Sequence, residues 1–160
     1  DISNKFGVEI KVVTGGIKRE DSVKNGVDAS SSQADWIIIH DAARPFLTKK
    51  ILTEVVYACE LSDGAITAIP AVDTIKYSRN NIIEKTIDRN FVWLAQTPQV
   101  FNKSKLLYAY KNHNMNVSFI TDESSIMENM GYKISIVQGN ENNFKITTID
   151  DWKRAEALAR

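Results

Sequence analysis

The order of segments along the chain predicts an α/β fold with a mostly parallel sheet and helices on both faces. Apolar segments with strand character at 8–13, 36–40 and 65–69 alternate with two segments of helical periodicity at 20–29 and 49–61. Trp36-Ile37-Ile38-Ile39 is continuously apolar, which is typical of a central parallel strand buried on both faces. This β-α-β-α-β order implies right-handed crossover connections.

The boundaries of the early segments are marked by changes in composition. Val8–Val13 alternates and then runs into Thr14-Gly15-Gly16, as a strand entering a loop does. The helix at 49–61 is indicated by apolar residues three and four apart, and Asp63-Gly64 marks its end. Each boundary is therefore indicated by residues adjacent to it in the sequence.

A different pattern begins at Pro70 and lasts to Asn90. Two short alternating segments, Thr74–Tyr77 and Ile82–Thr86, flank a polar turn at 78–81, which predicts a hairpin projecting from the sheet. An isolated hairpin is marginal in water, so it should pack on a second subunit or fold back on its own.

The remaining elements complete one unit. We expect a strand at 92–95, a helix capped by Asn102 through about residue 112, a helix from 121–123 to Gly131, a strand at 132–137 and a final helix from Asp150. With 160 residues, 43% of them hydrophobic, the chain has the size of a single domain.

The charge balance and the single cysteine narrow the classes of function. Twenty basic and twenty acidic side chains cancel, so neither a nucleic acid nor a membrane surface is an expected partner. Cys59, among apolar residues of a helix, is interpreted as core and suits a reducing compartment. No apolar run reaches the roughly 20 residues of a membrane span, and no signal peptide is visible, so we expect a cytoplasmic protein.

Candidate functional residues follow the strand at 36–39. Asp41 and Arg44 lie at its carboxyl end, where open α/β sheets bind ligands; the structural alternative is that Asp41 caps a helix. Arg89 and Lys145 also fall at loop ends and suit anionic substrates, although most such side chains are simply solvated. Side chains of this kind can neutralise the charge of phosphate groups.

Seven motifs in order make the chain resemble the methylerythritol phosphate cytidylyltransferases of the non-mevalonate isoprenoid pathway. They are Gly15-Gly16 with Arg19 and Asp21-Ser22-Val23, HDAARPF at 40–46, PAVDTIK at 70–76, DRN at 88–90, QTPQ at 96–99, which we expect to form a turn, TDE at 121–123 and NFKIT at 143–147. The resemblance implies a three-layer, Rossmann-like nucleotidyltransferase fold with a hairpin arm at 70–90. It also implies transfer of CMP from CTP to the polyol phosphate with release of pyrophosphate.

The resemblance implies a role for each matched residue. Asp41 would lie beside the nucleotide and its metal-bound phosphates, Arg44 would fix the polyol phosphate, and Arg89 and Lys145 would position it for attack. Substrate-binding threonines and contacts to the cytidine base are implied at two further sets of positions, which are Thr74, Thr97 and Thr121 for the substrate and Gly16 and Ser22 for the base. Asp41 is the expected neighbour of Mg²⁺ or another divalent cation, since magnesium needs few protein carboxylates.

The resemblance also implies a homodimer in which the arm carries Thr74 and Arg89 into the partner's site. Two departures accompany it: Ile17 replaces an acidic residue found in many relatives, and none of the seven glycines forms the G-x-G of a triphosphate-binding loop. Because the chain also starts at Asp1, we expect it to be incomplete at its N-terminus. The alternatives are a ribitol phosphate cytidylyltransferase, a truncated fragment that dimerises and binds ligand without turnover, or an unrelated nucleotide-binding domain.

Overall fold

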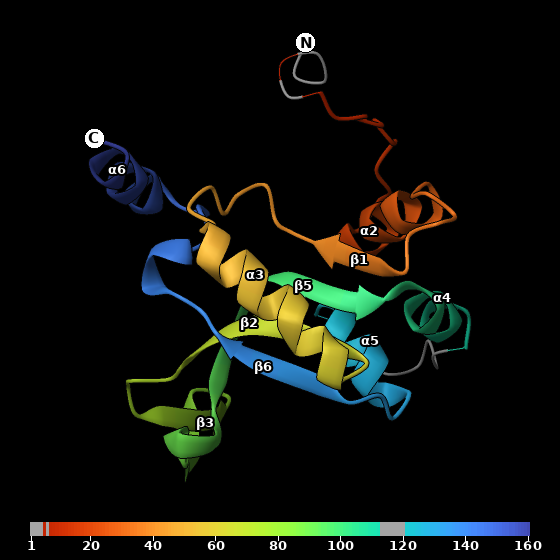
Figure 1. Ribbon diagram of the computed structural model, residues 1–160. Coiled ribbons are helices and arrows are strands. Elements are labelled where there is room, and N and C mark those ends of the chain that lie inside the picture. The colour runs from red at the N-terminus through yellow and green to blue at the C-terminus, as the bar shows by residue number, and fades with distance from the viewer. Residues whose placement is uncertain (1–4, 6, 113–120) are drawn as a thin grey trace.

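The computed structural model describes residues 5, 7–112 and 121–160, whose strands form a four-stranded sheet and a separate hairpin (Figure 1). The sheet has the order β1-β5-β2-β6, with bounds Trp36–Ile39, Trp93–Asn102, Gly64–Pro70 and Ile134–Gln138. The helices are α2 (Arg19–Asp28), α3 (Lys49–Ala58), α4 (Lys103–Asn112), α5 (Glu123–Asn129) and α6 (Ile149–Leu158). Short 3₁₀ turns are η1 (Cys59–Leu61), η2 (Arg89–Phe91) and η3 (Glu141–Asn143).

Three strands of this sheet run in one direction, and β5 runs against them. β2 pairs in parallel with β6, whereas β5 is antiparallel to both of its neighbours, β1 and β2. The predicted α/β fold with a mostly parallel sheet is thus confirmed. The carboxyl ends of β1, β2 and β6 meet at one edge of the sheet, and the amino-terminal half of β5 reaches the same edge.

β5 is longer than the strand predicted at 92–95. It continues to Asn102, so Thr97 lies inside a buried strand, and the prediction of a QTPQ turn was wrong. Gln99 pairs with both neighbouring strands, opposite Ile39 of β1 and Ile66 of β2. The β2 register is irregular between Ile66 and Ala68, opposite residues 96–98, and the loop residues Asn140 and Asn143 bond to Gln96 and Thr97 there.

Helices cover both faces of the sheet, as expected. One face packs α2, α4 and α5 around a cluster that includes Phe101, Leu106 and Met127, while α3 covers the other with Val55 and Cys59 (Figure 1). Cys59 is buried, which confirms its interpretation as core, and desolvation raises the pKa of its thiol to about 11. No helix in the described part of the chain is long and apolar enough to cross a membrane.

Two predictions about the first half of the chain were wrong. Residues 8–13 form no strand, because no described strand pairs with them, and Val12 is 93% exposed. The strand β1 is not buried on both faces: Ile37 and Ile39 face the core, whereas Trp36 and Ile38 are exposed. β1 is the last strand on its side of the described sheet, and its buried residues alternate with exposed ones, so one of its faces is packed.

The predicted hairpin consists of β3 (Ile75–Arg79) and β4 (Ile82–Ile87), paired antiparallel. Asn80 and Asn81 form its turn with positive φ values of 50° and 63°, a conformation that asparagine tolerates better than most residues. The hairpin projects away from the four-stranded sheet (Figure 1), and its side chains are mostly exposed. The arm at 70–90 is therefore present as an element without packing of its own.

The helix starts show which capping prediction holds. Asn102 accepts a hydrogen bond from the backbone of Lys105 and begins α4 as predicted. Asp41, in contrast, caps no helix: the next helix, α3, is capped by Thr48, so the capping alternative for Asp41 was wrong. The carboxylate of Asp41 is left to make other contacts.

Candidate functional site

A cavity of about 230 Å³ lies at the sheet edge where β1 ends. Five residues predicted from the sequence contribute to its wall: Asp41, Arg44, Thr97, Thr121 and Lys145. The other lining residues are Arg19, Ala95, Gln96, Gln99 and Asp122. Segments far apart in the sequence thus converge on one cavity with three basic side chains.

The carboxylate of Asp41 is the centre of this charge cluster. Its oxygens lie 3.1 Å from Nζ of Lys145, 3.5 Å from Nε of Arg19 and 3.7 Å from Nε of Arg44. Partial burial opposes ionisation, but the hydrogen bond and charge of Lys145, with the charges of both arginines, outweigh it and lower the pKa of Asp41. Asp41 is therefore a carboxylate that holds three cations around the cavity.

The backbone of Asp41 is fixed by the neighbouring strand. Its N–H donates to Oγ1 of Thr97 at 3.0 Å, and that hydroxyl also lies 3.0 Å from Nδ1 of His40. Nε2 of His40 lies 2.9 Å from the carbonyl of Arg44, which can only accept, so Nε2 carries the proton and Nδ1 accepts from Thr97. The Thr97 hydroxyl is consequently engaged within the protein and orients the turn that carries Asp41.

Asn143 forms a second support that sequence reasoning missed. This fully buried side chain donates to Oε1 of Gln96 at 3.1 Å and to the carbonyl of Thr97 at 2.8 Å. The backbone carbonyl of Asn143 accepts from Nη1 of Arg44 at 2.8 Å. Asn143 therefore ties the loop before α6, and with it Lys145, to β5 and Arg44; its place in the NFKIT motif was the available signal.

The loop before α2 brings Gly16 and Ser22 together. The N–H of Gly16 donates to Oγ of Ser22 at 2.9 Å, and a Cβ at position 16 would lie 2.1 Å from Cβ of Asp21, so only glycine fits. The Ile17 side chain is fully exposed and contributes no polar group to this loop. The expected base-binding residues are thus adjacent to one another.

The residues of the arm are not part of the cavity. Thr74 precedes β3 and Arg89 opens η2, both exposed, and neither lines the space around Asp41. The guanidinium of Arg89 donates to the carbonyl of Val72 at the base of the arm. The structure therefore unites part of the predicted site and leaves these two residues outside it.

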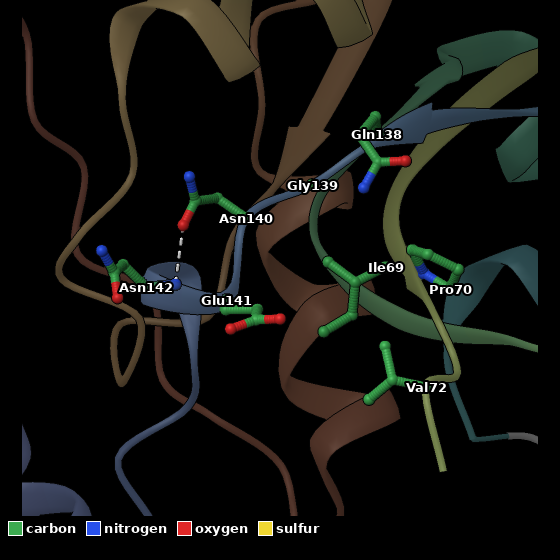
Figure 2. Close-up of a pocket in the computed structure, with 8 residues that line it drawn as sticks. All are labelled: Ile69, Pro70, Val72, Gln138, Gly139, Asn140, Glu141 and Asn142. Carbon is green, nitrogen blue, oxygen red and sulfur yellow. Dashed lines mark hydrogen bonds between the residues drawn. The ribbon is translucent and has the colours of Figure 1, made fainter. Parts of the chain in front are cut away.

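A second hollow of about 340 Å³ lies beside the first, at the ends of β2 and β6 (Figure 2). Its lining residues are Ile69, Pro70, Val72 and Gln138 to Asn142, and its one charged side chain is Glu141. Nε2 of Gln96, in the wall of the Asp41 cavity, donates at 3.0 Å to the carbonyl of Asn140, in the wall of this hollow, and so connects the two. Without a cation, this hollow is less suited to an anionic ligand than the cavity of Asp41.

The donor set around Asp41 does not form a protein-held metal site. Within residues 5, 7–112 and 121–160, no group of three or more His, Cys, Asp or Glu side chains is placed to hold a metal ion. Both oxygens of Asp41 already face basic groups. The expected association of Asp41 with magnesium stays a prediction.

An α/β sheet with a cation-lined cavity at its carboxyl edge is an arrangement suited to an anionic ligand. Comparison with known proteins agrees: the family described as 2-C-methyl-D-erythritol 4-phosphate cytidylyltransferase matches residues 1–160. The chain therefore belongs to that family.

Individual relatives support the same assignment. The chain is 41% identical over 150 residues to the 2-C-methyl-D-erythritol 4-phosphate cytidylyltransferase of Syntrophus aciditrophicus, covering 93% of this chain and 64% of that protein. Identity to the Clostridioides difficile enzyme of the same name is 35%, over 99% of this chain and 67% of that protein. The chain thus spans about two thirds of the length of these relatives.

Solved structures share the fold. The crystal structure of 4-diphosphocytidyl-2C-methyl-D-erythritol synthase from Anaerococcus prevotii matches with a TM-score of 0.90 at 31% identity, covering 99% of this chain and 74% of that one. The Thermus thermophilus cytidylyltransferase matches with a TM-score of 0.83 at 29% identity, covering 96% of this chain and 78% of that one.

Proposed function

We propose that the protein containing this chain transfers CMP from CTP to 2-C-methyl-D-erythritol 4-phosphate, giving the cytidine diphosphate derivative and pyrophosphate. The observation that carries this proposal is the cluster of Asp41, Arg44 and Lys145 at one cavity beside the Gly16–Ser22 loop. Family membership supports the same chemistry.

The reaction joins two anions, so its main requirement is charge neutralisation and alignment. An oxygen of the polyol phosphate attacks the α-phosphorus of CTP, and the bond to pyrophosphate breaks. Lys145 and Arg44 would neutralise the attacking phosphate, while Asp41 would keep these two cationic side chains oriented toward the cavity. The Gly16–Ser22 loop would face the cytosine.

We further propose that the arm completes this site in a second subunit. The cavity is lined by three cationic side chains and by two carboxylates, those of Asp41 and Asp122, so its net charge of +1 does not neutralise a phosphate dianion. Arg89 from a partner's arm would add the missing cation, and Thr74 would add a hydroxyl donor. A divalent cation would supply further neutralisation of the triphosphate, and the cytoplasm is the expected compartment.

Pyrophosphate release tests the proposal directly. The purified protein is supplied with CTP, Mg²⁺ and either 2-C-methyl-D-erythritol 4-phosphate or ribitol 5-phosphate. We expect release with the methylerythritol substrate and much less with ribitol phosphate.

Preference for ribitol phosphate would replace the proposed substrate by the alternative one. Binding of methylerythritol phosphate without pyrophosphate release would indicate a ligand-binding fragment.

A further inference from the structure

Arg19 lies between two acidic side chains, and its position was not explained by the sequence. Its Nη1 is 2.9 and 3.1 Å from the two carboxylate oxygens of Glu123, and its Nε is 3.5 Å from Asp41. Arg19 opens α2 and Glu123 opens α5, so this contact joins two helices next to the cavity. The three side chains form a row from the interior to the cavity.

Glu123 is the buried end of that row. Only 1% of its surface is exposed, and the hydroxyl of Tyr110 also donates to it at 3.4 Å. Desolvation raises the pKa of Glu123, while the charge of Arg19 opposes the rise. A buried carboxylate with a hydrogen-bonded guanidinium is costly to separate, so Arg19 is held firmly.

The other two cations around Asp41 are held differently. Lys145 is 41% exposed, and Asp41 is its one ion-pair partner in the described part of the chain. Arg44 is anchored to the backbone carbonyl of Asn143, and its Nε lies 3.7 Å from Asp41. A phosphate entering the cavity therefore attracts Lys145 more readily than it attracts Arg19.

We propose that Arg19 is a positioning residue: anchored by Glu123, it stays on Asp41 and frees Lys145 to bind the phosphate of the ligand. Two adjoining cavities, of about 230 and 250 Å³, share Arg19, Thr121 and Asp122 in their walls, so the arginine also fixes the border between them. This role rests on the proposed function only in taking a phosphate as the ligand.

Without Arg19, Asp41 would keep two cationic neighbours, Lys145 at 3.1 Å and Arg44 at 3.7 Å. Binding of a phosphate would then have to draw Lys145 away from Asp41 and leave the more distant Arg44 to compensate the charge of the carboxylate. Phosphate affinity should therefore fall by about tenfold, which corresponds to about 1.4 kcal/mol.

The test is a phosphorus NMR titration of the full chain with inorganic phosphate. Arg19→Gln alone leaves Glu123 buried without a cation, so the main variant is the double replacement Arg19→Gln with Glu123→Gln, which removes both charges. Arg19→Lys retains the charge but cannot reach both carboxylates, and serves as the conservative variant. The matched control, Lys24→Gln with Asp28→Asn, removes an exposed ion pair from the same helix.

We expect the double variant to bind phosphate about tenfold more weakly, Arg19→Lys to be intermediate and the control to be unchanged. If Arg19 acts by freeing Lys145, the double replacement should have little further effect in a Lys145→Gln background. The thermal midpoint of each variant is measured in parallel.

Three results would overturn the proposal. Unchanged phosphate affinity in the double variant, with or without a lower thermal midpoint, would assign Arg19 a structural role alone. A loss that persists fully in the Lys145→Gln background would mean that Arg19 contacts phosphate independently. Absence of phosphate binding to the unmodified chain would remove its basis, whereas phosphate binding without CTP turnover would contradict only the proposed function.

Discussion

The cavity around Asp41 and the hairpin arm carry two halves of one predicted site, but they differ in how they are held. Around the cavity, Thr97, Asn143 and Glu123 fix the charged groups through buried and partly buried hydrogen bonds. On the arm, Thr74 and Arg89 are exposed, and β3 pairs only with β4 within the described sheets. The cavity is therefore held by contacts within its own subunit, whereas the side chains of the arm are exposed to solvent.

This difference indicates where each half obtains its geometry. Leaving buried polar groups unpaired is costly, so hydrogen bonds within the subunit position the supports of the cavity before any ligand binds. A two-stranded hairpin with exposed faces has no such constraint and acquires its position from whatever it packs against. The comparison can be tested by disturbing each region separately.

The largest expected effect is on turnover. Lys145→Ala in the cavity and Arg89→Ala on the arm should each lower kcat/KM by about 10²- to 10³-fold, because each removes a cation from the same charged transition state. Pyrophosphate release measures the loss. Arg79→Ala is the control and should retain activity, because Arg79 lies on the same arm and its ion pair among the described residues is with Glu84 on the surface.

Mixing those two inactive variants separates a shared site from a self-contained one. If the arm serves a partner, each mixed dimer has one site with both Lys145 and an incoming Arg89. Random association makes half of the dimers mixed, so activity should recover to about one quarter of the unmodified level. Failure to recover, with subunit exchange verified by gel filtration of tagged chains, would place the arm on its own subunit.

A smaller effect is expected on stability. Asn143→Ala should lower the free energy of unfolding by about 2–3 kcal/mol, because it leaves the buried oxygens of Gln96 and Thr97 without their donor. Thr74→Ala, exposed on the arm, should change it by less than about 0.5 kcal/mol. Urea unfolding measures both, and similar losses would show that the arm is packed as tightly as the cavity.

The smallest effect is a pH dependence due to Asp41. Its pKa in the folded protein is lowered from 3.8, so its ion pairs contribute stability above that value and lose it as the pH falls through the lower folded pKa. The stability difference between the unmodified chain and Asp41→Asn should be constant above about pH 5 and narrow below about pH 4. If urea unfolding shows that the difference is as large at about pH 3 as at about pH 5, this role is contradicted.

Much of the fold was predictable because its signals are local. The periodicity of 49–61 predicted α3, the polar turn at 78–81 predicted the hairpin, and Asn102 predicted the start of α4. The failures concern pairing: 8–13 has strand composition but no neighbouring strand, and QTPQ resembles a turn but lies between two strands. Strand composition cannot specify which partners a segment will find.

The site divides in the same way. The motif HDAARPF and the loop residue Lys145 marked the charged groups, because acids and bases after apolar strands are visible in sequence. The supports Asn143 and Glu123 were not assigned roles, because their importance comes from burial next to residues distant in the chain. Such contacts depend on packing of several elements at once.

By itself, the sequence determined the α/β order of elements, the hairpin arm and the identity of the groups that can neutralise a phosphate, since these follow from local periodicity and side-chain chemistry. Only the tertiary structure decided that Asp41 is surrounded by Arg19, Arg44 and Lys145 while Arg89 lies elsewhere. The physical reason is that electrostatic and hydrogen-bond energies depend on distance and burial in space, which separation along the chain does not specify.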